Sequence, residues 1–315
     1  MRFLAGARWW AELSPAAGAA VMAAGIISAG LHLIGRDGLS IAALAFSAAL
    51  WLVLAADFTA RLLGDRRRFR AEADTPAALT AVAATAVLGT RLSLLGWQAV
   101  ALGLLVLAAV LWPGLLVAVL RHWGYRMPGA AFLVCVATQG LAVLAATLAA
   151  RTGHDWLGRA ALAAFCLGVL LYAEALVRFD FRQVVSGAGD HWVAGGALSI
   201  TALAGAGLTA SPLWTGWVHA GLRTVTLASL GLSLAWYAVL LAAEALRPRP
   251  RYDIRRWSSV FPLGMTATAC LAAAAPTGVR WLRPLGTVLL WVAVGAWVLT
   301  SVALLAERGR DRPGK

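Results

Sequence analysis

Long apolar runs follow one another along the whole chain, separated by short polar segments. A run of about 18 or more apolar residues has the length that crosses a bilayer as a helix. Ten such runs occur, at residues 14–34, 39–62, 75–95, 97–120, 128–150, 157–178, 190–210, 217–246, 257–275 and 281–306. The alternation that marks the strands of a membrane β-barrel is not seen. The pattern predicts an all-α integral membrane protein with ten transmembrane helices, in a single domain over residues 1–315.

The ten runs fall into two alternating classes. The odd-numbered runs carry small and hydroxylated residues such as Thr85, Thr138 and Ser199, whereas the even-numbered runs are mostly Leu, Ala, Val and Trp. Small and hydroxylated residues belong where helices meet closely or face water, and bulky aliphatic residues belong against lipid. We therefore expect five helical hairpins, with an inner ring of odd helices around a central pore and an outer ring of even helices.

Composition agrees with membrane insertion. Of the 315 residues, 61% are hydrophobic and only 13% are charged, against about 25% charged in a soluble domain. No cleavage-like site follows the N-terminus, so the first run is expected to be retained. Cys135, Cys166 and Cys270 lie within apolar runs. We expect them to be small buried hydrophobic residues, not a disulfide framework or a metal site.

The distribution of charge predicts the orientation of the chain. The net charge is +13, and 26 of the 27 cationic residues are Arg. With the N-terminus in the cytoplasm, 20 cations lie in cytoplasmic segments and seven lie on the opposite side, which is the asymmetry that the positive-inside rule describes. We therefore expect a multi-pass protein of the cell membrane with both termini cytoplasmic. Because the Arg residues lie in short loops between runs, nucleic acid is not an expected partner.

Residues 252–269, with the sequence YDIRRWSSVFPLGMTATA, combine a cation-rich loop with a proline inside an apolar helix. Pro262 has no N–H and its ring crowds the carbonyl of Ser258, so we expect the helix to bend there. The ring of Phe261 would be held at the bend, where an aromatic group can close a narrow pore by excluding water. The alternative is an ordinary proline-kinked membrane helix packed by small residues, with Phe261 facing lipid or the protein core.

The expected pore is neutral. The odd runs hold no ionised residue at membrane depth, where a cation or proton pathway would carry acidic residues or histidines. A polar, uncharged lining beneath an Arg-rich mouth favours anions, although such linings also serve uncharged solutes. For Gln139, a hydrogen bond between helices is the alternative to a functional role. Phe261 is the candidate gate, and the candidate pore-lining residues are Met22, Gly25, Thr85, Thr138, Gln139, Gly196, Ser199, Pro262 and Thr266.

Chemistry other than transport has little support in the sequence. The five histidines are scattered, no pair of them has metal-ligand spacing on one helix, and no Gly-rich phosphate loop or Ser/His/Asp grouping stands out. We expect no cofactor, no metal and no enzyme activity. Asp190 and His191 are the candidates for proton coupling, with an interfacial helix start as their alternative role. A membrane enzyme or scaffold is the alternative from another functional class.

Four segments carry motifs that match a known transporter family. They are Ser14-Pro15 with residues 21–28, residues 136–139, residues 191–207 and residues 252–265. On these segments the chain resembles the tellurite-resistance/C4-dicarboxylate transporter family, whose plant members are the guard-cell slow anion channels. The resemblance extends over nearly the whole chain. Two positions depart from the family pattern, Ala24 where Thr is usual and Gly195 where Met is common.

The resemblance implies ten helices, a five-helix inner ring around a central pore that an aromatic residue on the ninth helix closes, and a homotrimer. Phe261 would be that aromatic residue. The resemblance also implies anion transport, and members of the family pass chloride, nitrate, sulfite, malate or tellurite-related species. The leading hypothesis is therefore a channel or carrier for a small inorganic anion or a C4-dicarboxylate. The alternative with the same fold is a proton-coupled dicarboxylate or sulfite-type transporter.

Overall fold

The computed structural model describes residues 17–64, 72–187, 189–248 and 253–310. Ser14, Pro15 and Tyr252, which contribute to the motifs above, lie outside these ranges. Within the described ranges the chain forms helices and turns, with no β-strand. Nine helices in this part of the chain are long and apolar enough to cross a membrane, and a further apolar helix, α1 (Gly18–Leu33), is shorter.

The helices coincide with the predicted apolar runs to within a few residues. A four-residue helix, α8 (Gln183–Ser186), lies in the loop between α7 and α9. The even-numbered runs form α2 (Asp37–Gly64), α5 (Gln98–Arg121), α7 (Asp155–Arg178), α10 (Gly216–Leu246) and α12 (Leu282–Arg310). The odd-numbered runs form α1, α4 (Thr80–Leu94), α6 (Leu133–Thr152), α9 (Val193–Thr209) and α11 (Trp257–Thr277).

A short 3₁₀ turn precedes four of the odd-numbered helices. Pro76 is the first residue of the turn before α4, and Pro128 is the capping residue before α6. Proline fits at these positions because the first N–H groups of a helix have no partner within it. Pro262 differs, since it lies inside α11. The four turns are η3 (Pro76–Leu79), η4 (Gly129–Phe132), η5 (Asp190–Trp192) and η6 (Ile254–Arg256).

Burial separates the helices into the two predicted classes. The most apolar 18-residue windows of the runs containing α4, α6, α9 and α11 are 72–94% buried, whereas those of α2, α5, α7, α10 and α12 are 11–33% buried. In α1, 14 of the 16 residues are buried. We call α1, α4, α6, α9 and α11 the buried helices, and the other five the outer helices. The small residues of the buried helices allow their backbones to approach closely.

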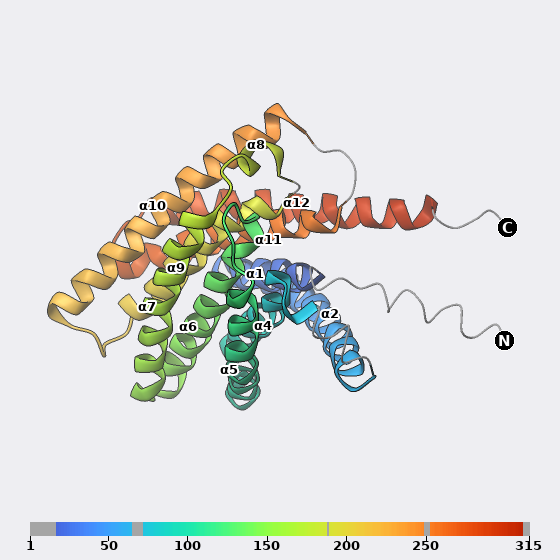
Figure 1. Ribbon diagram of the computed structural model, residues 1–315. Helices are drawn as coiled ribbons and strands as arrows, with labels where there is room; N and C mark the ends of the chain where they lie inside the picture. The colour runs from blue at the N-terminus through green and yellow to red at the C-terminus, as the bar shows by residue number, and fades with distance from the viewer. Residues whose placement is uncertain (1–16, 65–71, 188, 249–252, 311–315) are drawn as a thin grey trace.

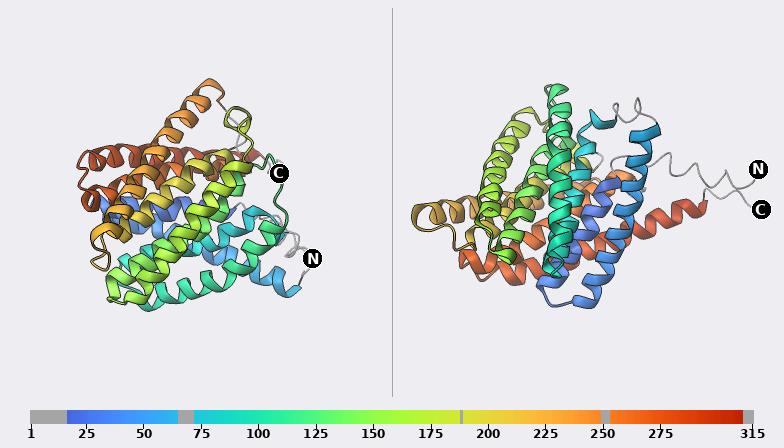
Figure 2. Two further views of the ribbon diagram at one scale, coloured as in Figure 1. Left: turned by 60° about the vertical axis from the view of Figure 1, so that its left-hand side comes forward. Right: turned by 90° about the horizontal axis from the view of Figure 1, so that it is seen from below.

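The buried helices pack against one another in succession. Helix α1 packs against α4, α4 against α6, α6 against α9 and α9 against α11, and α11 packs against α1. Each buried helix also packs against the outer helix that follows it in the chain. In Figure 1, α1 lies near the middle of the molecule, whereas α2, α5 and α10 lie at its edge. Figure 2 shows α10 and α12 projecting beyond their neighbours.

Candidate functional site

A cavity of about 200 Å³ lies among the buried helices, and all five of them contribute to its wall. The wall residues run from the middle of each helix toward its C-terminal end. The five helices therefore meet around one space in that half of the molecule. One wall residue from each helix, in chain order, is Ile26, Val87, Val143, Ile200 and Met265.

The wall of the cavity is apolar and carries no charge among the described residues. Its hydroxyl groups belong to Thr90, Thr147 and Thr268. The first two donate to backbone carbonyls of their own helices at 2.8 Å, and Thr268 donates to the carbonyl of Ile26 at 3.3 Å. A hydroxyl that donates its proton to a carbonyl presents only its oxygen lone pairs to a solute. The wall is therefore a neutral surface with few polar groups.

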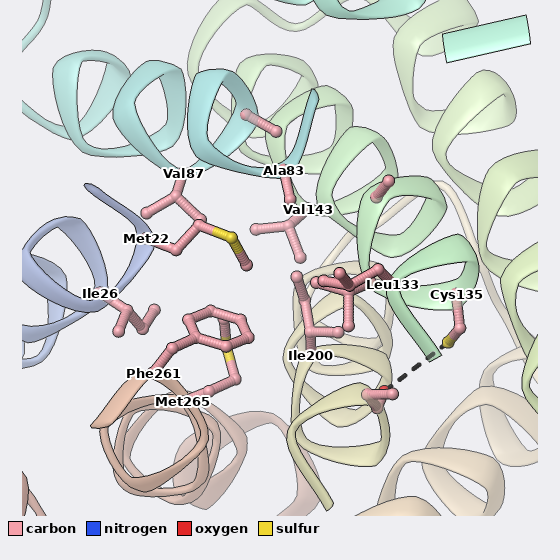
Figure 3. Close-up of a cluster of buried hydrophobic side chains, with 14 of the residues drawn as sticks. Met22, Ile26, Ala83, Val87, Leu133, Cys135, Val143, Ile200, Phe261 and Met265 are labelled. Carbon is pink, nitrogen blue, oxygen red and sulfur yellow. Dashed lines mark hydrogen bonds between the residues drawn. The ribbon is translucent and has the colours of Figure 1, made fainter. Parts of the chain in front are cut away.

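Phe261 lies next to the cavity and is 1% exposed, so it does not face lipid. It precedes the wall residue Met265 by four residues, which is about one helical turn. In the same way Met22, also 1% exposed, precedes the wall residue Ile26. Figure 3 shows the Phe261 ring directed into the space between the helices, with Met22 and Ile26 on one side and Ile200 on the other. An aromatic ring therefore lies next to the cavity, on the side toward the N-terminal ends of the buried helices.

Three of the predicted pore-lining residues bind outer helices through their polar groups. The indole N–H of Trp51 on α2 donates to the Thr85 hydroxyl at 2.9 Å, and Trp112 on α5 binds Thr138 at the same distance. The Gln139 amide donates to the carbonyl of Phe165 on α7 at 3.1 Å. This is the helix-to-helix hydrogen bond considered for Gln139 from the sequence. As pore-lining positions, these residues stay predictions.

Two more of the predicted residues meet in a cluster of hydroxyl groups. The Ser199 hydroxyl on α9 lies 2.8 Å from that of Thr266 on α11 and 2.5 Å from that of Ser233 on α10. All three side chains are buried. The cluster joins two buried helices to one outer helix, which is the role that small polar groups have in membrane packing.

The predicted glycines and Pro262 lie at close approaches between helices. A Cβ built on Gly25 would lie 2.7 Å from Cγ1 of Val87 on α4. A Cβ built on Gly196 would lie 2.9 Å from Cγ of Pro262. The structure thus brings Gly196 and Pro262 together and places Gly25 against α4. Of the predicted lining residues, Met22 lies beside Phe261 in Figure 3.

The sequence interpretation missed the residues that form the cavity wall. Most of them are ordinary aliphatic residues, and the others are Met265, three threonines, two glycines and Pro276, so that nothing in their chemistry distinguishes them from core residues. Their spacing carries a signal, however. Ile26, Ile200 and Met265 each follow a predicted site residue by four positions, and residues four apart lie on the same face of a helix.

Arg91 is an ionised residue of an odd run whose side chain is buried, which the sequence did not indicate. It lies within α4 and is only 1% exposed. Its Nη2 donates to the Ser40 hydroxyl at 2.9 Å, and its Nε lies 3.2 Å from the hydroxyls of both Ser28 and Ser40. Its Nη1 is buried without a hydrogen-bond partner in the described part of the chain. The prediction counted Arg91 as a loop cation because sequence position does not show where a long side chain turns.

Asp190 and His191, the proton-coupling candidates, lie in η5 at the N-terminal end of α9. One Asp190 carboxylate oxygen accepts a long hydrogen bond, 3.4 Å, from the backbone N–H of Ala130, and His191 is buried. A Cβ on Gly129 would lie 2.4 Å from the Asp190 carbonyl oxygen, so the backbones of η4 and η5 touch. The cavity wall on α9 begins at Ile200, so this pair is at the other end of the helix. Proton coupling stays a prediction.

Cysteines and metal-binding groups can be placed for the described residues. Cys135 and Cys270 are buried as expected, but Cys166 is exposed on α7, which corrects the expectation for that residue. A helix on the outside of the molecule has an exposed side, and Cys166 lies on it. No group of three or more His, Cys, Asp or Glu side chains in the described part of the chain could hold a metal ion.

Comparison with known proteins places the chain in a family. The family model described as "Voltage-dependent anion channel" matches residues 12–305. Two relatives are the uncharacterized membrane proteins Rv1735c and MT1776 of Mycobacterium tuberculosis, from strains H37Rv and CDC 1551. Each is 32% identical to this chain over 128 residues, which is 36% of this chain and 62% of the relative. The chain thus matches less than two thirds of the length of these relatives.

The family match extends over nearly all of the ten apolar runs, and it confirms the resemblance that the motifs carry. The apolar helices and the membrane-protein relatives agree with it. The chain is thus a multi-pass membrane protein that belongs to the voltage-dependent anion channel family, a family of anion transporters.

Proposed function

We propose that this protein carries anions through a conduit that runs between the five buried helices and is closed by Phe261. In this arrangement the buried helices form an inner ring, and the outer helices complete five hairpins and shield the ring from lipid. The observation that carries the proposal is the position of Phe261. Its ring is 1% exposed and lies one helical turn from a cavity to which all five buried helices contribute.

A ring at this position blocks passage in two ways. It fills the space between helices, and together with Met22 on α1 it places apolar side chains at the level next to the cavity. A narrow apolar constriction excludes water and, with it, hydrated ions. Opening then requires the Phe261 side chain to turn aside, or α11 to move relative to α1.

The polar residues of the buried helices have a different role in this proposal. The hydroxyls of Thr85, Thr138 and Ser199 and the amide of Gln139 hold the inner ring to the outer helices through the hydrogen bonds described above. They fix the radius of the ring and so the width of the conduit. The lining itself consists of Met22, Phe261 and the wall residues of the cavity.

The substrate is a small inorganic anion or a C4-dicarboxylate. The family is one of anion transporters, and the excess of Arg in the loops concentrates anions at the membrane surface. The same excess supports a location in the cell membrane with both termini cytoplasmic, which places the cavity on the extracytoplasmic side. A homotrimer follows from the family resemblance and is tested by the mass of the purified protein in detergent.

The decisive experiment measures anion flux through purified protein in liposomes. We expect chloride or nitrate efflux to rise several-fold in Phe261→Ala, because the substitution removes the ring that fills the conduit. Phe165→Ala is the matched control, since Phe165 is 4% exposed and lies on the outer helix α7. The control loses a ring of the same volume that packs against Gly205 on α9 but does not line the cavity. Because the backbone carbonyl that Gln139 binds stays in place, efflux should remain at the wild-type level.

Two outcomes would count against the proposal. Unchanged efflux in folded Phe261→Ala would remove Phe261 from the gate. Equal increases in both variants would mean that loosened packing, not an opened conduit, lets anions through. The same liposomes with an imposed pH gradient test proton coupling, because flux that ignores the gradient leaves no role for titration of Asp190 or His191.

A further inference from the structure

Arg91 carries a buried charge with no carboxylate partner. No ion pair joins it to a carboxylate in the described part of the chain, and its hydrogen bonds go to the neutral hydroxyls of Ser28 and Ser40. Asp37 acts on it electrostatically. The Asp37 side chain, however, is 64% exposed and lies 2.8 Å from Nδ1 of His32. Water therefore screens that carboxylate, whereas the guanidinium is 1% exposed.

Arg91 and its partner Ser28 are neighbours, along the chain, of residues that form the cavity wall. On α4, Arg91 stands between Thr90 and Leu94, and both of these residues line the cavity. On α1, its partner Ser28 precedes Ala29, which also lines the cavity. The side chain of Arg91 thus joins α4 to α1 and α2 next to wall positions, without itself lining the cavity.

The electrostatic potential of a charge in this position is only weakly screened. Burying an unpaired cation is unfavourable, so most proteins pair it with an anion or expose it. Within the protein the effective dielectric constant is well below that of water, and a unit charge therefore acts over about one helix-packing distance with little screening. The hydroxyls of Ser28 and Ser40 bind Nε and Nη2 without cancelling the field of the charge, and Nη1 has no hydrogen-bond partner in the described part of the chain. The cavity wall itself carries no charge, and Arg91 is a buried charge adjacent in the chain to wall residues.

We infer that Arg91 sets the charge selectivity of the conduit, by making the cavity electropositive through its wall. The inference rests on the proposed transport function and deepens it. The field of Arg91 stabilises an anion in the cavity relative to a cation of the same size, although no cationic side chain contacts the anion. Because the charge acts through the wall and not by contact, it selects for the sign of the solute and leaves the solute free to move on. Arg91 is in this sense a specificity-determining residue.

The test compares Arg91→Lys with Arg91→Met. Both substitutions remove the planar fork that binds Ser28 and Ser40, but only Met removes the charge. Reversal potentials under a KCl gradient, measured in planar bilayers with and without Phe261→Ala, give the anion-to-cation permeability ratio. We expect Lys to keep this ratio near the wild-type value and Met to lower it by roughly a hundredfold, because one unit charge across one packing layer, at an effective dielectric constant near 20, changes the permeability of the anion and of the cation by about tenfold each, in opposite directions.

A purely structural role for Arg91 predicts a different result. Both variants would then lose stability by similar amounts, and the permeability ratio would be equal in the two. Thermal unfolding of each variant in detergent gives the stability, so that the two effects are measured separately. A ratio that does not differ between Lys and Met overturns the inference.

A second variant keeps the test open if Arg91→Met does not fold. Ser40→Asp replaces the hydroxyl that now lies 2.9 Å from Nη2 of Arg91 with a carboxylate. The carboxylate neutralises the charge of Arg91 while the arginine itself is kept. It should lower the permeability ratio in the same direction, and an unchanged ratio would overturn the inference. If the protein carries anion current but the anion-to-cation permeability ratio is unchanged in every Arg91 and Ser40 variant, only this inference is overturned. Absence of any anion current defeats the proposed function as well.

Discussion

Gly196 on α9 and Pro262 on α11 pack backbone against ring. A Cβ added to Gly196 would lie 2.9 Å from Cγ, 3.1 Å from Cβ and 3.4 Å from Cα of Pro262. Contacts under 3.0 Å require one partner to shift, and the rigid proline ring cannot turn aside as a flexible side chain would. Phe261 directly precedes Pro262. The distance between α9 and α11 at the level of the candidate gate is therefore set by the absence of a side chain at residue 196.

Gly196→Ala should displace α11 and with it the Phe261 ring. We expect a loss of stability of about 1–3 kcal/mol from overpacking, together with altered anion flux. Gly207→Ala on the same helix is the control, because its Cβ would meet only Ala146 at 3.4 Å. That substitution should be neutral or stabilising by up to about 1 kcal/mol, since Ala is the better helix former. Thermal unfolding in detergent distinguishes the two, and equal stabilities would show that α9 and α11 can adjust freely.

The bond between Trp51 and Thr85 tests whether polar residues of the buried helices line the conduit or anchor it. A double-mutant cycle with Trp51→Phe and Thr85→Val should give a coupling free energy of about 1 kcal/mol, the usual net worth of one hydrogen bond. The permeability sequence among anions should not change in Thr85→Val, because the hydroxyl faces α2. The cycle for Trp112 and Thr138 has the same geometry and serves as a replicate. A changed permeability sequence would indicate that the Thr85 side chain lines the conduit.

The membrane helices and their two classes could be predicted from the sequence because both depend on composition along a run. Residues that pack closely are small, residues against lipid are bulky, and these preferences do not depend on tertiary detail. For Phe261 the sequence left a lipid-facing position open, and the structure excludes it because the side chain is 1% exposed.

The direction of individual side chains could not be predicted. Thr85 can bond the carbonyl of Ala81 in its own helix whichever way it faces, so its hydroxyl does not reveal whether it points to a pore or to Trp51. Arg91 is near the end of its run, and only tertiary structure shows that its side chain turns inward to Ser28 and Ser40. The sequence therefore could not identify the mainly aliphatic residues of the cavity wall, and the polar lining residues stay predictions.

Asp253 provides a pH-dependent contribution at the start of α11. Its carboxylate accepts hydrogen bonds from the Arg255 side chain, at 2.6 Å from Nη2, and from the Arg255 backbone N–H at 2.9 Å. The Arg255 side chain is the main cause of a lowered pKa for Asp253. A lowered folded-state pKa gives stability that is complete above the unfolded value, about 4, and is lost as the pH falls through the folded value.

Asp253→Asn keeps an acceptor for the backbone N–H and removes the charge. Because both side chains of the pair are at least 35% exposed, the difference in unfolding free energy at neutral pH should be at most about 1 kcal/mol. It should shrink toward zero as the pH is lowered below about 4. Unfolding of wild type and variant from pH 3 to pH 7 checks this. A constant difference over that range would assign the effect to packing instead of charge.

Filling the cavity tests the conduit independently of the gate. Val143 on α6 lines the cavity, so Val143→Phe places a second ring about one helical turn from Phe261. In the Phe261→Ala background this ring should return anion flux to the wild-type level, because the pathway that the first substitution opens passes through the cavity. The same change at Leu170, which is 67% exposed on the outer helix α7, should leave the raised flux unaltered. If Val143→Phe and Leu170→Phe have the same effect on anion flux in the Phe261→Ala background, anions do not pass through the cavity. The proposed conduit between the five buried helices would then be wrong.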